Sequence, residues 1–313
     1  MIANKSTKRS FKLFTALVNL LRMRSTDIIL EYFDVSVYRQ DFDNLREDQW
    51  LNDNNLTFWY EYLERSELTE ASNPQEFLLL RPSMVFLLAQ SQNPLELKDV
   101  LPSLEQAHYV FLPINDNDDV DLAEGGSHWS LLIVDLQKKE GFYYDTLDDT
   151  NVAPAEVVAK KLAILDNCPQ FTLYSLPTPQ QTNGSDCGVM VCMLTSHFLR
   201  KILDMQSSDT KKSIEWHVED NLVSAKRGRH LLSYAILDLI SKYGRKIGSS
   251  EEIGIKLDAN KTKEDSSSSL SCGTTTTTEN DQSEDSESAV PVDISKAIRR
   301  SHHLHLHRRN HGI

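Results

Sequence analysis

The spacing of apolar residues divides the chain between about residues 26 and 244 into helices and strands. Apolar positions three and four apart predict helices, and short apolar runs bounded by turn residues predict strands. The expected helices cover 56–63, 77–89, 155–165, 187–203 and 229–242, and the expected strands cover 109–114, 129–136, 142–145 and 171–176. The helix over 77–89 is expected to be entered through Pro82 and Ser83. Helices gather at both ends of this region around a central set of strands, which predicts an α+β fold rather than a regular βαβ alternation.

The N-terminal segment differs from this region in charge. Its first 24 residues carry six Lys or Arg and no acid, and they are weakly amphipathic. A mitochondrial presequence has the same character. Translation that starts at Met23 would omit the segment, so it is expected to be optional or an artefact of gene prediction. We therefore expect residues 1–25 to form a flexible basic extension, with a targeting signal as the alternative.

The C-terminal segment changes composition beyond about residue 244. Serine and threonine runs alternate with acidic residues there, and too few apolar side chains are present to build a core. The last residues are rich in His and Arg; clustered histidines can hold a metal, but without a defined spacing a solvated basic end is favoured. The predicted organisation is an extension over 1–25, a globular domain over 26–244 and a disordered tail over 245–313.

The charge of the chain restricts its ligands. The formal net charge is −13, and because the first residues are basic, the acidity lies mainly in the globular region. Nucleic-acid binding needs a basic surface, so nucleic acid is not expected as a main ligand. An acidic domain suits a partner with a basic face, although simple solubility explains it equally well. No apolar run reaches the roughly 18–20 residues of a membrane span, so no membrane association is expected. We expect a monomer.

The cysteines indicate the compartment. The chain has four, Cys168, Cys187, Cys192 and Cys272, and their spacing fits neither a disulfide framework nor a metal site. This usage predicts a reducing intracellular environment, for which nucleus and cytoplasm are both suitable. No metal or organic cofactor is implied.

One of these cysteines is placed for chemistry. The turn Gly184-Ser185-Asp186 has a helix-capping signature and precedes an apolar run, so Cys187 is expected at a helix N-terminus. The free N–H groups and the helix dipole favour a thiolate at that position, and Gly188 permits close approach of a substrate. Cys192 lies in the apolar interior of the same helix and is expected to be inert. A lone cysteine in an apolar helix often only packs in the core. The assignment of Cys187 as a nucleophile therefore depends on whether the chain also supplies a base and its partners.

His128 supplies a candidate base, since the pKa of histidine lies near neutral pH. It opens a strand after a glycine-containing loop, so its ring is expected to project from a sheet edge towards solvent, with Trp129 facing the opposite way. Other histidines are present at 108, 197, 217 and 230. His197 lies in an apolar helix, and no pairing partner is evident for the rest.

Asp145 is the candidate that would orient His128. A hairpin that turns at 138–141 places Asp145 opposite Val134, on the same sheet face as His128 but several residues away. Spacing alone therefore does not bring the two side chains into contact without a strong twist or bulge. Asp148 and Asp149 follow directly and remain alternatives.

A glutamine completes the set. Gln181 lies in a loop six residues before Cys187, and its amide N–H₂ is a neutral donor suited to a developing oxyanion, with the backbone N–H of Cys187 as a second donor. Gln180 is adjacent and has the same chemistry. The residues alone do not separate the two.

The order His128, Asp145, Gln181, Cys187 and its spacing resemble the Ulp/sentrin-specific family of cysteine proteases, which cleave after the C-terminal Gly-Gly of ubiquitin-like modifiers. Residues 50–63 and 79–88 resemble the deneddylase branch, called sentrin-specific protease 8. That branch removes the cullin modifier, a Nedd-type protein, and matures its precursor. The resemblance covers most of 26–243 and implies a papain-like fold with a central mixed or antiparallel sheet flanked by helices.

The resemblance also implies a role for each site residue. It makes Cys187 the nucleophile, His128 the general base, Asp145 its orienter and Gln181 the oxyanion donor; Trp129 roofs a narrow tunnel, Trp50 forms another part of it, and Asp53 contacts the modifier. Two indoles leave no room for a Cβ atom, so the di-glycine becomes a steric requirement. The partners implied are the Nedd-type modifier and its conjugates, such as cullins.

Three alternatives remain. The same enzyme class could prefer SUMO or ubiquitin. An acetyltransferase on the same scaffold would need acetyl-coenzyme A, and the pair Trp50 and Trp129 argues against it. A catalytically inactive module that only binds the modifier is the third, and sequence does not establish that the catalytic geometry is competent.

Overall fold

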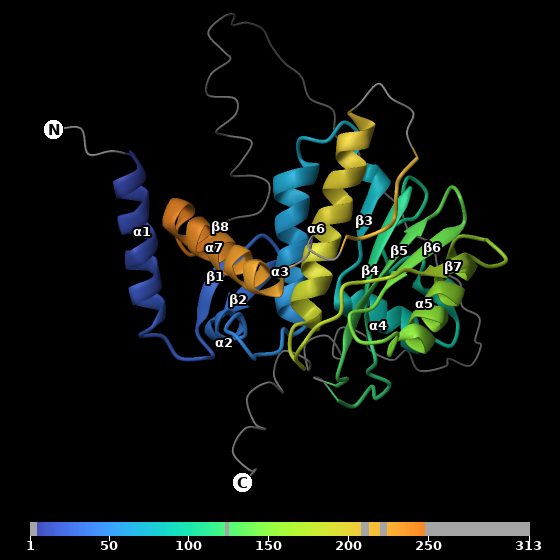
Figure 1. Ribbon diagram of the computed structural model, residues 1–313, viewed down its shortest axis with the longest axis horizontal. Coiled ribbons are helices and arrows are strands. Elements are labelled where there is room, and N and C mark those ends of the chain that lie inside the picture. The colour runs from blue at the N-terminus through green and yellow to red at the C-terminus, as the bar shows by residue number, and fades with distance from the viewer. Residues whose placement is uncertain (1–4, 123–124, 208–212, 220–223, 248–313) are drawn as a thin grey trace, which may run out of the picture. The chain divides into compact units, whose positions relative to one another are not determined.

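The computed structural model describes residues 5–122, 125–207, 213–219 and 224–247 (Figure 1). The chain separates into two units, Met1–Gly248 and Ser249–Ile313, and the described residues all belong to the first. The predicted tail therefore lies almost entirely outside the described residues. The α-helices are α1 (Lys5–Leu20), α2 (Arg39–Asp43), α3 (Asp53–Leu63), α4 (Pro82–Gln90), α5 (Val152–Leu165), α6 (Cys187–Gln206) and α7 (Ala225–Tyr243). The strands are β1 (Ile28–Tyr32), β2 (Val35–Tyr38), β3 (Phe77–Leu79), β4 (Tyr109–Asn115), β5 (Trp129–Asp135), β6 (Glu140–Tyr144), β7 (Thr172–Ser175) and β8 (Lys246–Ile247).

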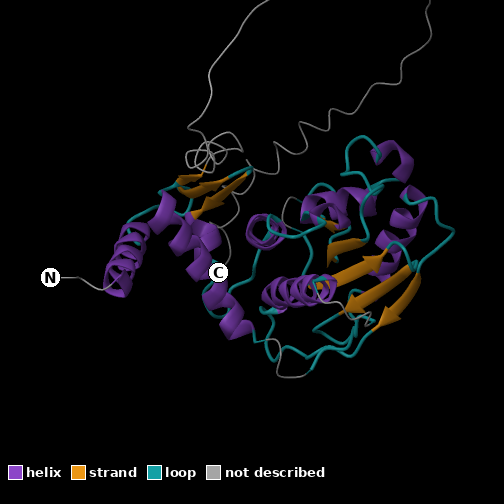
Figure 2. Ribbon diagram, turned by 90° about the horizontal axis from the view of Figure 1, so that it is seen from above, coloured by secondary structure: helices purple, strands orange, loops and turns teal. Residues whose placement is uncertain are grey.

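A five-stranded sheet in the order β3-β4-β5-β6-β7 lies at the centre. The pairs within β4-β5-β6 are antiparallel and the two outer pairs are parallel. Every residue of β5 is buried, and alternate side chains enter two different cores. Leu131 and Ile133 pack with residues of α6, while Leu132 and Val134 pack with residues of α5. Helices therefore cover both faces of the sheet, as Figure 2 shows from above, and this agrees with the predicted α+β class.

The turn between β5 and β6 lies earlier in the chain than the sequence indicated. Asp135 pairs with Glu140, so the turn occupies 136–139 rather than 138–141. The Oδ1 atom of Asp135 accepts hydrogen bonds from the backbone N–H groups of Gln137 and Lys138, at 3.1 and 2.9 Å. Lys139 then reverses the chain with a φ of 59°. The predicted register of this hairpin was wrong because a side-chain-capped turn leaves no signal in the apolar spacing.

The predicted helix over 77–89 is in fact a strand followed by a helix. Residues Phe77–Leu79 form β3, and α4 begins only at Pro82. Arg81 has an extended backbone, with φ −66° and ψ 149°, because the ring of a following proline disfavours the helical conformation. Pro82 itself fits the first helical position, where no N–H partner is needed. The expected entry at Pro82 and Ser83 agrees with the start of α4, but the apolar residues before it gave no sign of a strand.

A second, three-stranded sheet in the order β2-β1-β8 was not predicted. Strands β1 and β2 are antiparallel, while β8 adds in parallel and comes from the far end of the described chain. Each strand is short, with at most five residues, and the parallel partner lies far away in sequence. Such pairing depends on tertiary contacts that local patterns do not encode.

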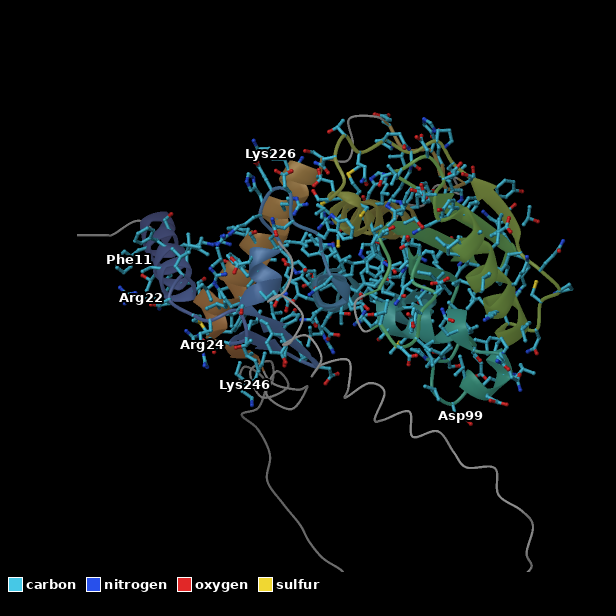
Figure 3. All side chains as sticks on the ribbon, turned by 90° about the horizontal axis from the view of Figure 1, so that it is seen from below. Phe11, Arg22, Arg24, Asp99, Lys226 and Lys246 are labelled. Atoms are coloured by element: carbon cyan, nitrogen blue, oxygen red, sulfur yellow. The ribbon has the colours of Figure 1, made fainter. Side chains whose placement is uncertain are left out.

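Helix α1 lies beside α7 (Figure 1), where the sequence indicated a flexible arm. Ala16 and Leu20 are buried, and Arg9 forms an ion pair with Asp238 of α7 at 2.9 Å. Phe11 lies on the outer side of the helix, 71% exposed (Figure 3). The buried side of this weakly amphipathic segment thus packs against the protein. Among the helices that the structure describes, none is long and apolar enough to cross a bilayer.

Candidate active site

Cys187 is the first residue of α6 and is buried, with 4% of its surface exposed. This confirms the predicted position at a helix N-terminus, where the first-turn N–H groups lack intrahelical partners and the dipole is positive. The turn before it is closed by Asn183, whose Oδ1 atom accepts hydrogen bonds from the backbone N–H groups of Ser185 and Asp186. Asp186 is the N-cap residue, but its carboxylate makes no capping hydrogen bond.

His128 and Asp145 are in direct contact. Nε2 of His128 lies 2.6 Å from Oδ1 of Asp145, and both side chains are buried. The expectation that the ring projects to solvent was therefore wrong. The contact follows from the shifted hairpin register: Leu131 pairs with Tyr144, so Asp145 continues towards the start of β5, next to His128.

Further donors hold the carboxylate of Asp145. Its Oδ2 atom accepts from the hydroxyl of Tyr143 at 2.7 Å and from the backbone N–H of Asn151 at 3.0 Å, and its Oδ1 atom accepts from the backbone N–H of Leu147 at 2.8 Å. Burial on its own would raise the pKa of Asp145, but the hydrogen bonds from His128 and these donors lower it below its ordinary value. Asp145 is consequently a fixed anion beside the imidazole.

The imidazole of His128 has partners on two sides. Since Nε2 faces Asp145, Nδ1 is the ring nitrogen left for Cys187. Burial opposes protonation, yet hydrogen bonds with Asp145 and Cys187 outweigh it and raise the pKa of His128 to about 9. The ring is thus held as an imidazolium at neutral pH. A thiolate at a helix N-terminus needs such a cation as its partner.

The two glutamines differ in their partners. Gln181 accepts from the Oγ1 hydroxyl of Thr146 at 2.8 Å and donates from Nε2 to the carbonyl of Asn183 at 2.7 Å. This amide therefore bridges the segment after Asp145 and the turn before Cys187. Gln180 instead donates to the carbonyl of Asp145 at 3.0 Å. The choice of Gln181 as oxyanion donor stays a prediction that this bridging position favours.

Trp129 packs against the second residue of α6 and against the segment that contains Leu51. It is 8% exposed, and its Nε1 atom donates to the carbonyl of Leu51 at 3.1 Å. A Cβ atom added to Gly188 would lie 2.9 Å from Cβ of Leu51 and 3.3 Å from Cδ1 of Trp129. These three residues therefore meet at the position that follows Cys187 in the chain, and no larger residue than glycine fits at 188 without a shift.

The other two residues implied by the resemblance lie on the surface near this contact. Trp50, next to Leu51 in the chain, is 54% exposed. Asp53 is the first residue of α3 and is exposed. Their expected roles, in the tunnel and in modifier contact, remain predictions.

Several supporting residues were not identified from the sequence. Asn151 is fully buried; its Nδ2 atom donates to the carbonyl of His128 at 2.9 Å while its backbone N–H binds Asp145. Asp116 accepts from the backbone N–H of His128 at 2.9 Å. Tyr143, which also binds Asp145, is the one supporting residue with a signal in the sequence: it lies two positions before Asp145, which directly follows β6, and so on the same face. The others lie in loops whose course the sequence does not give.

The alternative residues have other partners. Asp149 accepts from the hydroxyl of Ser175, at 2.8 Å. His108 was expected to lack a partner, but its Nε2 atom lies 3.1 Å from Oδ1 of Asp135, at the opposite end of β5 from His128. Within the described ranges, no three His, Cys, Asp or Glu side chains are grouped to hold a metal ion.

Comparison with known proteins agrees with this geometry. Residues 49–220 match the Ulp1 protease family, C-terminal catalytic domain. A "NEDD8-specific protease 2" of Schizosaccharomyces pombe is 38% identical over 230 residues, which cover 72% of this chain and 54% of that protein. The human "Sentrin-specific protease 8" is 30% identical over 203 residues, which cover 60% of this chain and 94% of that protein. The chain thus spans about half the length of the fission-yeast relatives, 54% and 53% of two of them.

A solved structure gives the fold independently. The C-terminal Ulp1 protease domain in complex with Smt3, the yeast ortholog of SUMO, matches with a TM-score of 0.55 over 74% of this chain and 96% of that domain. Its sequence is 23% identical, so the likeness concerns the papain-like fold alone. From the matched family region, the similar relatives and the shared fold, we conclude that the chain belongs to the Ulp1 protease family.

Proposed function

We propose that this protein is a thiol protease that cleaves after the C-terminal glycine of a ubiquitin-like modifier of the NEDD8 type. The observation that carries the proposal is the position of His128 between Asp145 and Cys187, at the N-terminus of α6. The relatives named NEDD8-specific proteases support the modifier class. On this proposal the enzyme releases the modifier from conjugates and trims its precursor.

The first half of the reaction forms a covalent intermediate. The thiolate of Cys187 attacks the carbonyl carbon of the terminal glycine, and the carbonyl electron pair moves onto oxygen. The backbone N–H of Cys187 and the Nε2 amide of Gln181 are the proposed donors to this oxyanion. The C–N bond then breaks as His128 transfers its proton to the departing amine, which leaves a thioester on Cys187.

The second half returns the enzyme to its starting state. Neutral His128 takes a proton from water, and the resulting hydroxide adds to the thioester carbonyl. Collapse of this intermediate expels the sulfur as a thiolate and releases the modifier with a free carboxylate. His128 is then protonated again, and Asp145 has kept its ring oriented throughout.

Substrate selection is proposed to rest on the contact of Leu51, Trp129 and Gly188, the residue that follows Cys187. A chain that reaches Cys187 past the indole of Trp129 must be narrow, because side chains add width at each Cβ atom. Two consecutive glycines satisfy this requirement. Exposed Trp50, which precedes Leu51, is proposed to form another part of the same passage. Asp53 on α3 is proposed to contact the body of the modifier.

Cullin conjugates are the substrates that the deneddylase branch implies, and we propose them here together with a monomeric enzyme. The reducing nucleus and cytoplasm are the proposed compartments, since a catalytic thiol must remain unoxidised.

The proposal is tested by turnover on C-terminal fluorogenic fusions of NEDD8, SUMO and ubiquitin. Wild type is compared with Cys187→Ala, and with Cys168→Ala as a control at a partly exposed cysteine outside the site. Fast release from the NEDD8 fusion by wild type and by the Cys168 variant, abolished in the Cys187 variant, is expected.

Each other outcome points to a named alternative. Preference for SUMO or ubiquitin would keep the mechanism and reject the modifier class. Activity that survives Cys187→Ala would reject the mechanism. Absence of turnover on all three fusions would leave a modifier-binding module or an acetyltransferase, which are separated by measured affinity for the modifiers and by autoacetylation with acetyl-coenzyme A.

A further inference from the structure

Arg229 of α7 is a buried cation close to the site, with 3% of its surface exposed. Its Nε and Nη2 atoms bind Oδ1 of Asp186 at 3.0 and 2.8 Å, and Nη2 also donates to the carbonyl of Ser185 at 3.0 Å. Asp186 is the N-cap of α6 and directly precedes Cys187. One side of the guanidinium thus holds the turn that delivers the nucleophile.

The same guanidinium also holds a second segment, far away in sequence. Nη1 donates to the carbonyls of Asn44 and Arg46 at 3.0 and 2.7 Å, and Nη2 donates to the carbonyl of Gln49 at 2.8 Å. Gln49 directly precedes Trp50 in the chain. The other side of the guanidinium therefore fixes the segment that leads into the proposed tunnel.

These two segments meet next to Cys187 in the chain. Leu51 continues the second segment; its carbonyl accepts from Trp129, and its Cβ lies 2.9 Å from where a Cβ on Gly188 would be. A displacement of either segment would therefore change the gap through which a substrate tail reaches Cys187. Arg229 is in contact with both segments at once.

The chemistry of this contact requires arginine. A buried guanidinium is tolerated when an anion and further acceptors satisfy its N–H groups, and Asp186 with four carbonyls does so here. The planar fork spans several acceptors in fixed directions, whereas a lysine ammonium is a compact point charge that cannot reach all of them. Lysine at 229 would keep the charge and lose the bridge.

We propose that Arg229 is a positioning residue, which sets the gap between the nucleophile turn (residues 183–187) and the tunnel segment (residues 44–51) and thereby admits the modifier tail. The inference rests on the proposed protease function and deepens it. Arg229 touches no reacting atom; it acts through Asp186 and through the carbonyls before Trp50.

The test compares Arg229→Lys with wild type and with Arg227→Lys, a matched change at an exposed position of the same helix. Two reactions are followed: turnover of the NEDD8 C-terminal fusion, whose tail must pass the gap, and alkylation of Cys187 by iodoacetamide, which is small. For Arg229→Lys we expect kcat/KM to fall on the order of 100-fold, with alkylation nearly unchanged. Arg227→Lys should match wild type in both reactions.

Amide hydrogen exchange supplies a measurement that does not depend on activity. In Arg229→Lys, exchange should rise in both the nucleophile turn and the tunnel segment, because both lose the same partner. A rise in neither segment, or in one alone, would overturn the bridge. The exchange measurement tests the bridge even if wild type cleaves no modifier fusion. Absence of cleavage by wild type would reject the proposed function and would leave the bridge to be judged by exchange alone.

A second variant covers the case in which Arg229→Lys does not fold. Asp186→Ala removes the anion and leaves the carbonyl partners of Arg229 in place, so it weakens the link to the nucleophile turn, where only the carbonyl of Ser185 remains, and keeps every link to the tunnel segment. Exchange should then rise in 183–187 and stay unchanged in 44–51, with a smaller fall in kcat/KM. Equal losses of turnover and alkylation in either variant would show a general defect of the thiolate and would overturn the positioning role.

Discussion

At the scale of single residues, two neighbours set the charge of His128. The carboxylate of Asp145 at 2.6 Å and the sulfur of Cys187 both stabilise the imidazolium, and together they outweigh the cost of burial. The pKa of His128 rises from an ordinary value of 6.5 to about 9. Because the folded-state pKa is the higher one, this contribution to stability is complete below pH 6.5 and is lost as pH rises through about 9.

Asp145→Asn removes the charge and should reverse part of this shift. We expect kcat/KM to fall on the order of 10²–10⁴-fold, and its alkaline limb, near pH 9 in wild type, to move to lower pH. A pH–rate profile from pH 6 to 10 measures both effects. An unchanged alkaline limb would show that Asp145 does not set the pKa of His128.

The same variant gives a stability prediction. Between pH 7 and 10, wild type should lose more thermal stability than Asp145→Asn, since only wild type has the full ion pair to lose. Differential scanning calorimetry at several pH values measures the difference. Parallel curves would contradict the linkage.

At the scale of elements, helix α6 approaches the tunnel segment so closely that its second residue must be glycine. Alanine normally favours a helix by roughly 0.5–1 kcal/mol over glycine. At Gly188, however, the new methyl group would lie 2.9 Å from Cβ of Leu51, which cannot move without its backbone. The effect of alanine at 188 is therefore set by the steric displacement of Leu51 and not by the helix preference of alanine.

Gly188→Ala should reduce kcat/KM on the NEDD8 fusion by on the order of 10-fold or more, because the displaced segment narrows the passage. Gly184→Ala is the matched control, since an added Cβ there meets nothing within 4 Å. Steady-state kinetics on both variants is the measurement. Similar losses in the two would point to a general effect of the turn instead.

The packing of α1 on α7 gives a further prediction at this scale. Leu20 is 1% exposed, whereas Phe14 on the same helix is 63% exposed. Leu20→Ala should lower the free energy of unfolding by about 2–4 kcal/mol, and Phe14→Ala by no more than about 0.5 kcal/mol. Urea denaturation measures both. Equal, small effects would indicate that α1 detaches from α7 in solution.

At the scale of the whole molecule, every candidate site residue lies in the unit Met1–Gly248. A protein that ends at Gly248 should keep kcat/KM on the NEDD8 fusion within about two-fold of the full chain. Kinetics and thermal unfolding of the two proteins side by side are the measurement. A large loss of activity would assign residues 249–313 a part in catalysis or in modifier binding.

Much of the fold was predictable because apolar spacing reports local structure. Strand β4 and helices α5, α6 and α7 lie within a few residues of their predicted bounds. Short strands such as β1 and β8 were missed, since their partners lie elsewhere in the chain. The run over 77–89 was misread because a buried strand and a buried helix are equally apolar.

The sequence by itself determined which chemical groups are present and that Cys187 begins a helix, since capping residues and an apolar stripe are local properties. The tertiary structure alone decided that His128 meets Asp145, because that contact depends on a turn closed by a side chain of Asp135. It also decided the place of Arg229, whose partners lie more than 40 and more than 180 residues away. Contacts between distant segments are fixed by packing and by buried charge, which no local pattern records.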